Sequence, residues 1–252
     1  MSLSNKIVSP AEWLEARKAL LVKEKELTRL SDEIAKQRRA LPWEEVSKDY
    51  VFDGVNGKET LSDLFKDKSQ LIVYHFMLAP EEDAGCTGCS FIGDHHNGTD
   101  AHLEQRDTTW VAVSRAPYEK LAKYKERMGW TWKWVSADGN SFPEDMNVYF
   151  KDPLTGTETY NYSTTKFSSG DWPGLSVFYK DKDTGKIYHT YSTYARGLDV
   201  LLSTLKELDF TPKGRDEEQF GRNKMAWVKR HDEYEAEGDC CSTRKADSTV
   251  AA

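Results

Sequence analysis

Two cysteines separated by two residues are the feature of this sequence with the clearest chemical potential. Cys86 and Cys89 lie in the segment EEDAGCTGCSFIGDHHNG, and the histidines His95 and His96 follow them. The segment comes directly after SQLIVYHFML, a nearly continuous apolar run that predicts a buried strand. A thiol at a strand-to-helix junction faces unpaired N–H groups and the positive end of the helix dipole, and both favour the thiolate. The pair therefore predicts a redox-active dithiol.

The spacing gives each sulfur a different task. The second cysteine lies one turn up the predicted helix on the same face, so it can attack a mixed disulfide formed by the first. We expect Cys86 to be the attacking thiol and Cys89 the resolving thiol. The acidic run Glu81, Glu82 and Asp83 works against this, because nearby negative charge raises a thiol pKa. Two structural thiols are the competing interpretation, and the spacing favours function over it.

A copper(I) site on the same two sulfurs is the second hypothesis. Soft thiolates favour copper(I), so Cys86 and Cys89 could hold it in a copper-binding protein or a copper-dependent oxidase. His95 lies nearly two helical turns beyond Cys89 and is poorly placed to share a metal with Cys86. A structural zinc site needs a second well-spaced pair, whereas Cys240 and Cys241 are adjacent in a polar tail. Dithiol chemistry itself requires no cofactor.

An alternation of strands and helices surrounds the dithiol and would position it. The predicted strands are residues 69–78, 108–114, 131–136, 174–181 and 186–193, and the helices among them are residues 117–128 and 197–208. The order is a β-α-β unit followed by a β-β-α unit, with the dithiol after the first buried strand. This is the element order of an α/β thioredoxin-like fold.

Topology also predicts which distant segments reach the dithiol. Ligands in open α/β sheets bind at the carboxyl edge of the parallel strands. The next parallel strand ends on that edge, the first hairpin strand begins there, and the second hairpin strand returns to it. These ends predict a substrate cleft formed by Arg115, Pro173, Tyr191, Tyr194 and Arg196. Pro173 is also a candidate cis-proline, while either arginine could instead belong to a structural ion pair.

A long helix is predicted over residues 9–40, with Ser9, Pro10 and Glu12 as its start signal. Its apolar stripe consists of Trp13, Ala16, Leu20, Leu27, Leu30 and Ile34. The stripe either packs on the main domain or pairs with a second copy in a homodimer, and length and periodicity alone do not separate these.

The sequence predicts that the chain is divided into four parts. They are an N-terminal helical extension (1–42), a thioredoxin-like domain (43–211), a C-terminal helix (212–234) and a disordered tail (235–252). An irregular insertion over residues 139–172 precedes the last hairpin.

The composition argues against several classes of function. The 252 residues carry a formal net charge of −7, which argues against a broad nucleic-acid surface. No apolar run has the length of a membrane span, and the first residues lack the apolar core of a secretory signal. We therefore expect a cytoplasmic protein that binds neither nucleic acid nor membrane. In that compartment a lone CxxC is more often catalytic or metal-binding than a structural disulfide.

Longer motifs add a resemblance to a known family. YHFMLAPEEDAGCTGCSF, VAVSRAPYEKLAKYKERMGWTWKWVS, YHTYSTYARGLDVLLSTL and KRHDEY resemble the thioredoxin-like proteins of the domain of unknown function 899 family, over roughly residues 10–234. That family is similar to the peroxiredoxin branch of thioredoxin folds. The resemblance implies a thioredoxin-like fold. The dithiol at the strand-to-helix junction leads us to expect a thiol-disulfide oxidoreductase or thiol peroxidase-like protein acting on a small thiol, disulfide or peroxide, or on a protein disulfide. One departure is that Asp83 stands three residues before Cys86, where peroxiredoxins place a hydroxyl residue.

Overall fold

The computed structural model describes residues 5–151, 158–165, 170–221 and 223–234. The chain divides into two compact units, Met1–Glu44 and Glu45–Ala252. The predicted disordered tail, residues 235–252, lies outside the described residues.

The first unit is dominated by helix α1 (Pro10–Arg39). Ser9 caps it by accepting a hydrogen bond from the Glu12 backbone N–H, and the Glu12 carboxylate accepts one from the Ser9 N–H, which forms the predicted capping box. The basic residues Lys36, Arg38 and Arg39 occupy the last turn, where they complement the helix dipole. The predicted long helix is confirmed, and none of its residues is buried.

The second unit is built on a mixed sheet with the strand order β1-β10-β9-β4-β5-β6-β2-β3. The strands are β1 (Glu44–Glu45), β2 (Val51–Gly54), β3 (Gly57–Thr60), β4 (Gln70–His75), β5 (Thr108–Ser114), β6 (Lys133–Ser136), β9 (Gly174–Lys180) and β10 (Ile187–Tyr194). Central β4 has parallel β5 on one side and antiparallel β9 on the other, and β9 pairs antiparallel with β10. This arrangement is that of a thioredoxin-like fold, as predicted.

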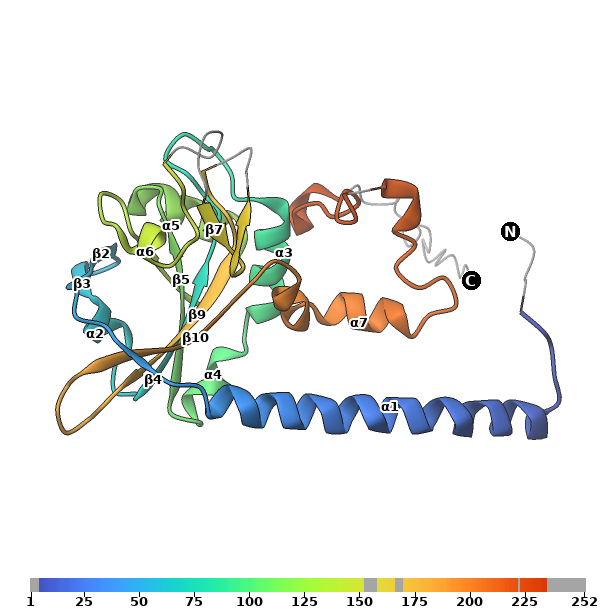
Figure 1. Ribbon diagram of the computed structural model, residues 1–252. Coiled ribbons are helices and arrows are strands. Elements are labelled where there is room, and N and C mark those ends of the chain that lie inside the picture. Colours follow the sequence, from blue (N-terminus) through green and yellow to red (C-terminus); the bar gives the residue numbers. More distant parts are fainter. Residues whose placement is uncertain (1–4, 152–157, 166–169, 222, 235–252) are drawn as a thin grey trace, which may run out of the picture. The chain divides into compact units, whose positions relative to one another are not determined.

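Helices cover both faces of this sheet (Figure 1). They are α2 (Leu61–Leu64), α3 (Thr87–His96), α4 (Asp100–Glu104), α5 (Tyr118–Arg127), α6 (Phe142–Asp145) and α7 (Ser203–Asp209). Side chains alternate along β4, so Tyr74 joins the core under α3, α5 and α7, whereas Leu71 and Val73 join the core under α2 and α6. A strand buried on both faces explains the continuous apolar run in the sequence.

An indole cluster fixes the position of α3 against the sheet. Trp130, Trp132 and Trp134 are all buried. Trp132 donates its indole N–H to the Gly93 carbonyl of α3 at 3.1 Å. A Cβ atom on Gly93 would lie 2.9 Å from the Trp130 ring, so only glycine allows this close approach.

Two helix predictions need correction. The expected helix over residues 197–208 is a 3-10 helix, η1 (Ala195–Leu201), followed by α7, because Leu202 at φ −111° and ψ 82° interrupts the helical path. The expected C-terminal helix over residues 212–234 is wrong. The described part of it holds only the 3-10 turns Glu218–Phe220 and His231–Glu233, and positive φ angles at Gly214 and Gly221 break helical continuity.

The insertion before the last hairpin has more structure than the sequence suggests. Its described part contains α6 and a two-stranded sheet of β7 (Glu158–Tyr160) and β8 (Ser163–Thr165). Across all described residues, no helix combines the length and the apolar character needed to cross a bilayer.

Candidate active site

Cys86 occupies the N-cap position of α3, directly after the loop that follows β4. Its backbone N–H donates to the Met77 carbonyl at 3.1 Å, which closes the loop. Its own carbonyl accepts hydrogen bonds from the backbone N–H and the hydroxyl of Ser90, at 2.8 and 2.9 Å, so the helix begins at this residue. The structure thus has the predicted strand-to-helix junction at the first cysteine.

The surroundings of Cys86 favour its thiolate. Hydrogen bonding from the Cys89 thiol, with further bonds from the backbone N–H groups of Cys89 and Gly88, lowers the pKa of Cys86 to about 6. Burial and the charge of Glu82 oppose this shift and raise the pKa. The predicted effect of the acidic run is therefore present through Glu82, but the hydrogen bonds outweigh it.

Cys89 has the opposite character. Its side chain is buried, and burial followed by its interactions with Cys86 raises the pKa of the Cys89 thiol well above the ordinary value. The Met77 backbone N–H donates to its sulfur at 3.4 Å. Both cysteines are free thiols. The pair therefore combines a thiolate at Cys86 with a buried, protonated thiol at Cys89.

Two tyrosines that the sequence did not single out lie close to Cys89. Tyr74 of β4 is fully buried, its hydroxyl has no hydrogen-bond partner among the described nitrogen and oxygen atoms, and its interaction with Cys89 lowers the pKa of that thiol. Tyr160 of β7 donates to the Pro173 carbonyl at 2.7 Å and accepts from the Ala195 N–H at 3.1 Å. Burial, with the nearby charge of Cys89, raises the pKa of Tyr160 to about 12.

Arg115 is committed to a structural ion pair. Its Nε and Nη2 donate to the two Asp171 carboxylate oxygens at 2.6 and 2.8 Å, and its guanidinium stacks on the Tyr149 ring at 3.7 Å. With Met77, Asp171 and Trp172 it lines a small hollow near the end of β4. The structure thus has Arg115 in an ion pair, and its role in a substrate cleft stays a prediction.

The other predicted cleft residues have divergent surroundings. The peptide bond before Pro173 is trans, so the expected cis-proline is wrong. The Pro173 carbonyl accepts a hydrogen bond from the Tyr160 hydroxyl. Tyr194 is buried and donates to the Met146 carbonyl at 2.9 Å, while Tyr191 is half-buried on β10. Arg196 is 87% exposed and pairs with Asp199, because the turn at Ala195 (φ 47°) starts η1 and carries its side chain outward.

A C-terminal segment, Trp227–Glu233, holds the cysteine loop and α3 from outside. Arg230 donates to the Gly85 carbonyl through Nε at 3.0 Å and Nη2 at 2.6 Å. Within the same segment His231 binds Asp94 of α3 at 2.7 Å, and Val228 is buried in the core. Sequence periodicity gave no indication of these contacts, since the segment is neither helix nor strand.

The histidines near the dithiol are engaged in other contacts. His95 bonds to the Phe91 carbonyl and the Thr204 hydroxyl, and His96 bonds to Asp100 at 2.8 Å. Among the described residues there is no group of three or more histidines, cysteines, aspartates or glutamates that could hold a metal ion. The copper(I) hypothesis therefore remains a prediction that rests on the two thiolates alone.

His75 is a histidine of the core. It is buried, bonds to the Ser176 hydroxyl at 2.9 Å, and burial lowers its pKa to about 3.

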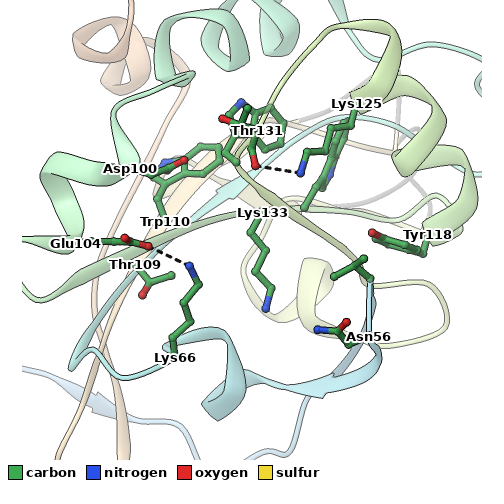
Figure 2. Close-up of a pocket in the computed structure, with 13 residues that line it drawn as sticks. Asn56, Lys66, Asp100, Glu104, Thr109, Trp110, Tyr118, Lys125, Thr131 and Lys133 are labelled. Atoms are coloured by element: carbon green, nitrogen blue, oxygen red, sulfur yellow. Dashed lines mark hydrogen bonds and ion pairs between the residues drawn. The ribbon is translucent and has the colours of Figure 1, made fainter.

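A cavity of about 400 Å³ lies among β2–β3, α4 and the first residues of β5 and β6, and neither cysteine lines it (Figure 2). Its lysines are matched by groups of the protein. Lys66 pairs with Glu104 at 3.0 Å, Lys133 pairs with Glu59, and Lys125 donates to the Thr131 carbonyl at 3.2 Å. The cavity therefore presents no unmatched lysine to a ligand.

The sheet order and the dithiol at the start of α3 together define a thioredoxin-like protein. The sequence profile of the family described as "Bacterial protein of unknown function (DUF899)" matches residues 2–234, and the chain belongs to this family. No curated protein sequence matches the chain.

Solved structures similar to this chain include peroxiredoxins. Peroxidoxin BcpB from Mycobacterium tuberculosis is 16% identical with a TM-score of 0.42, over 66% of this chain and 96% of that one. A cysteine-to-serine mutant of PrxQ from Xylella fastidiosa is 18% identical with a TM-score of 0.40, over 63% and 88%. The bacterioferritin comigratory protein of Xanthomonas campestris, studied for alkyl peroxide reduction, is 14% identical with a TM-score of 0.42, over 66% and 96%.

Proposed function

We propose that this protein is a thiol-disulfide oxidoreductase with Cys86 as the attacking thiolate and Cys89 as the resolving thiol. The observation that carries the proposal is the placement of Cys86 at the N-cap of α3. There the Cys89 thiol and two backbone N–H groups donate hydrogen bonds to the Cys86 sulfur. That arrangement stabilises negative charge on one sulfur while keeping a proton on the other.

The chemistry on a disulfide substrate proceeds in two exchanges. The Cys86 thiolate attacks one substrate sulfur, a mixed disulfide forms, and the other substrate sulfur leaves as a thiolate. The charge on Cys86 is then gone, and with it one cause of the raised pKa of Cys89. Cys89 loses its proton, attacks the Cys86 sulfur and releases the second substrate thiolate. The substrate disulfide gains two electrons, and the protein is left with a Cys86–Cys89 disulfide.

A peroxide could enter the same cycle. The Cys86 thiolate would attack one peroxide oxygen, giving a sulfenic acid and releasing water or an alcohol, and Cys89 would condense with the sulfenic acid to release water. The position three residues before Cys86 is Asp83, which is fully exposed and offers no hydroxyl donor. We therefore favour disulfide substrates, either small molecules or a protein disulfide, over peroxides.

Free thiols at both positions are in keeping with a reducing compartment, and we propose the cytoplasm as the place of action.

The Cys89→Ser variant separates the two chemistries when it and its control are made in a background with serine in place of Cys240 and Cys241, so that no other thiol can carry an adduct. With oxidised glutathione, we expect a stable mixed disulfide on Cys86, because the resolving thiol is absent, and intact-mass spectrometry would detect the adduct. With hydrogen peroxide, a sulfenic acid on Cys86 would be captured by dimedone. Cys86→Ser is the matched control and should give neither product. Absence of both adducts from Cys89→Ser would contradict the proposal, while dimedone capture without glutathione capture would reassign the substrate to peroxide.

A further inference from the structure

Helix α1 carries a seam of apolar side chains, yet none of its residues is buried. Trp13, Leu20 and Leu27 are 59%, 55% and 64% exposed, and Leu30 is 56% exposed. Helices in proteins gain most of their stability from packing an apolar face, and α1 runs for 30 residues. The seam therefore finds no packing partner among the described residues of its own unit, Met1–Glu44.

The spacing of the seam identifies the kind of partner. Trp13, Leu20, Leu27 and Ile34 recur every seven residues, and Ala16, Lys23 and Leu30 lie three residues after the first three of them. In heptad notation these are the a and d positions. A strict seven-residue repeat keeps one seam facing a second helix along the whole length, as in a coiled coil.

We propose that α1 pairs with α1 of a second copy of this chain in a parallel, in-register coiled coil. Parallel pairing sets each g residue against the e residue five positions ahead in the other chain. Glu12 then faces Arg17 of the partner subunit, and Glu33 faces Arg38 of the partner subunit. The other two g positions, Ala19 and Glu26, meet Glu24 of the partner subunit and Ser31 of the partner subunit. No like charges meet across the dimer at these flanking positions.

Antiparallel pairing gives a worse match of charges. With the two seams fully overlapped, Glu26 would lie against Glu26 of the partner subunit, and Glu24 against Glu24 of the partner subunit. Both contacts bring carboxylates together at the centre of the dimer, and like-charge contacts disfavour an arrangement. The charges at the flanking e and g positions therefore favour the parallel orientation.

Two polar side chains near the seam fit this arrangement. Lys23 occupies a d position, so parallel pairing sets it against Lys23 of the partner subunit, but its ammonium bonds to Glu26 of the same helix at 3.0 Å, which draws the charge away from the seam. The Arg17 Nη1 atom has no hydrogen-bond partner within the described residues. The Glu12 carboxylate of the partner subunit would supply one.

Solution mass tests the dimer. We expect the full-length protein to have the mass of two chains by multi-angle light scattering. Leu20→Lys combined with Leu27→Lys should raise the dissociation constant at least about a hundredfold, because four buried leucines are lost from the seam. Val22→Lys, an equally drastic change at an exposed position outside the seam, is the matched control and should leave the dimer intact. A monomeric wild-type protein, or a dimer that survives both seam substitutions, would overturn the proposal.

Cross-linking tests the orientation. In a background with serine at the four native cysteine positions, Leu27→Cys should form an interchain disulfide efficiently, since parallel pairing places residue 27 opposite its own copy. Antiparallel pairing would instead cross-link a mixture of Lys23→Cys and Leu27→Cys chains, and that result would refute the parallel arrangement. Neither readout depends on the redox activity of the dithiol.

Discussion

The Cys86→Ser variant is expected to lose disulfide reductase activity by a factor of about a thousand or more, because removal of an enzyme nucleophile has effects of that order or larger. The cause is specific to the sulfur. The Cys86 thiol reaches its thiolate with a pKa of about 6, whereas a serine hydroxyl at the same N-cap position would remain neutral. Turnover of a disulfide substrate with a thiol reductant measures the loss.

The control for this prediction is the fold of the variant. Serine is close in size to cysteine and suits an N-cap position, so the thermal unfolding temperature should change little. Cys89→Ser should also lose turnover, yet it should still react once with substrate. Turnover of Cys86→Ser at the wild-type rate would remove Cys86 from the mechanism.

The Trp132→Ala variant is expected to lose about 3–5 kcal/mol of unfolding free energy, the usual cost of truncating a buried tryptophan. Trp132 is 1% exposed, stacks on Trp130 with ring centroids 4.8 Å apart, and donates to the Gly93 carbonyl of α3. Its removal leaves a cavity under the helix that carries the dithiol and leaves that carbonyl without its indole donor. Urea denaturation followed by circular dichroism provides the measurement.

Trp132→Phe is the matched control for this loss. It keeps an aromatic ring in the cluster and removes the indole donor, so we expect a cost of about 1–3 kcal/mol. A loss below about 1 kcal/mol for Trp132→Ala would mean that the indole cluster does not support α3.

The sheet could be predicted from the sequence because its signals are local. β5 begins and ends at the predicted residues, since an apolar, β-branched run buried on both faces has sharp ends. The leucine pattern over residues 197–208 predicted the secondary structure less well. Leu198, Leu202 and Leu205 are buried, but the spacing of apolar residues cannot distinguish one α-helix from a 3-10 helix that breaks at Leu202.

The candidate site was predictable only in part, for a related reason. The position of Cys86 and Cys89 follows from sequence spacing and the preceding strand, and both are local. Tyr160 and Arg230 reach the site through tertiary contacts from irregular segments, where no periodicity marks them. Topology places Arg196 at a sheet edge but does not fix which way its side chain turns, so its exposure and its pairing with Asp199 could not be predicted.

The pH dependence of Cys86 alkylation tests the account most directly. Reduced wild-type protein would be treated with iodoacetamide from about pH 4 to about pH 10, and the alkylated sites quantified by tandem mass spectrometry, because Cys86 and Cys89 share a peptide and only fragmentation between them tells the two apart. Only the thiolate reacts, so the Cys86 rate should be half-maximal near its pKa of about 6, be lost as the pH falls below that value, and stay level above it. Cys89 should resist alkylation throughout, because it is buried and its pKa is raised. A Cys86 rate that still rises toward the ordinary thiol pKa of 9.0, or faster labelling of Cys89, would contradict the assignment of Cys86 as the attacking thiolate.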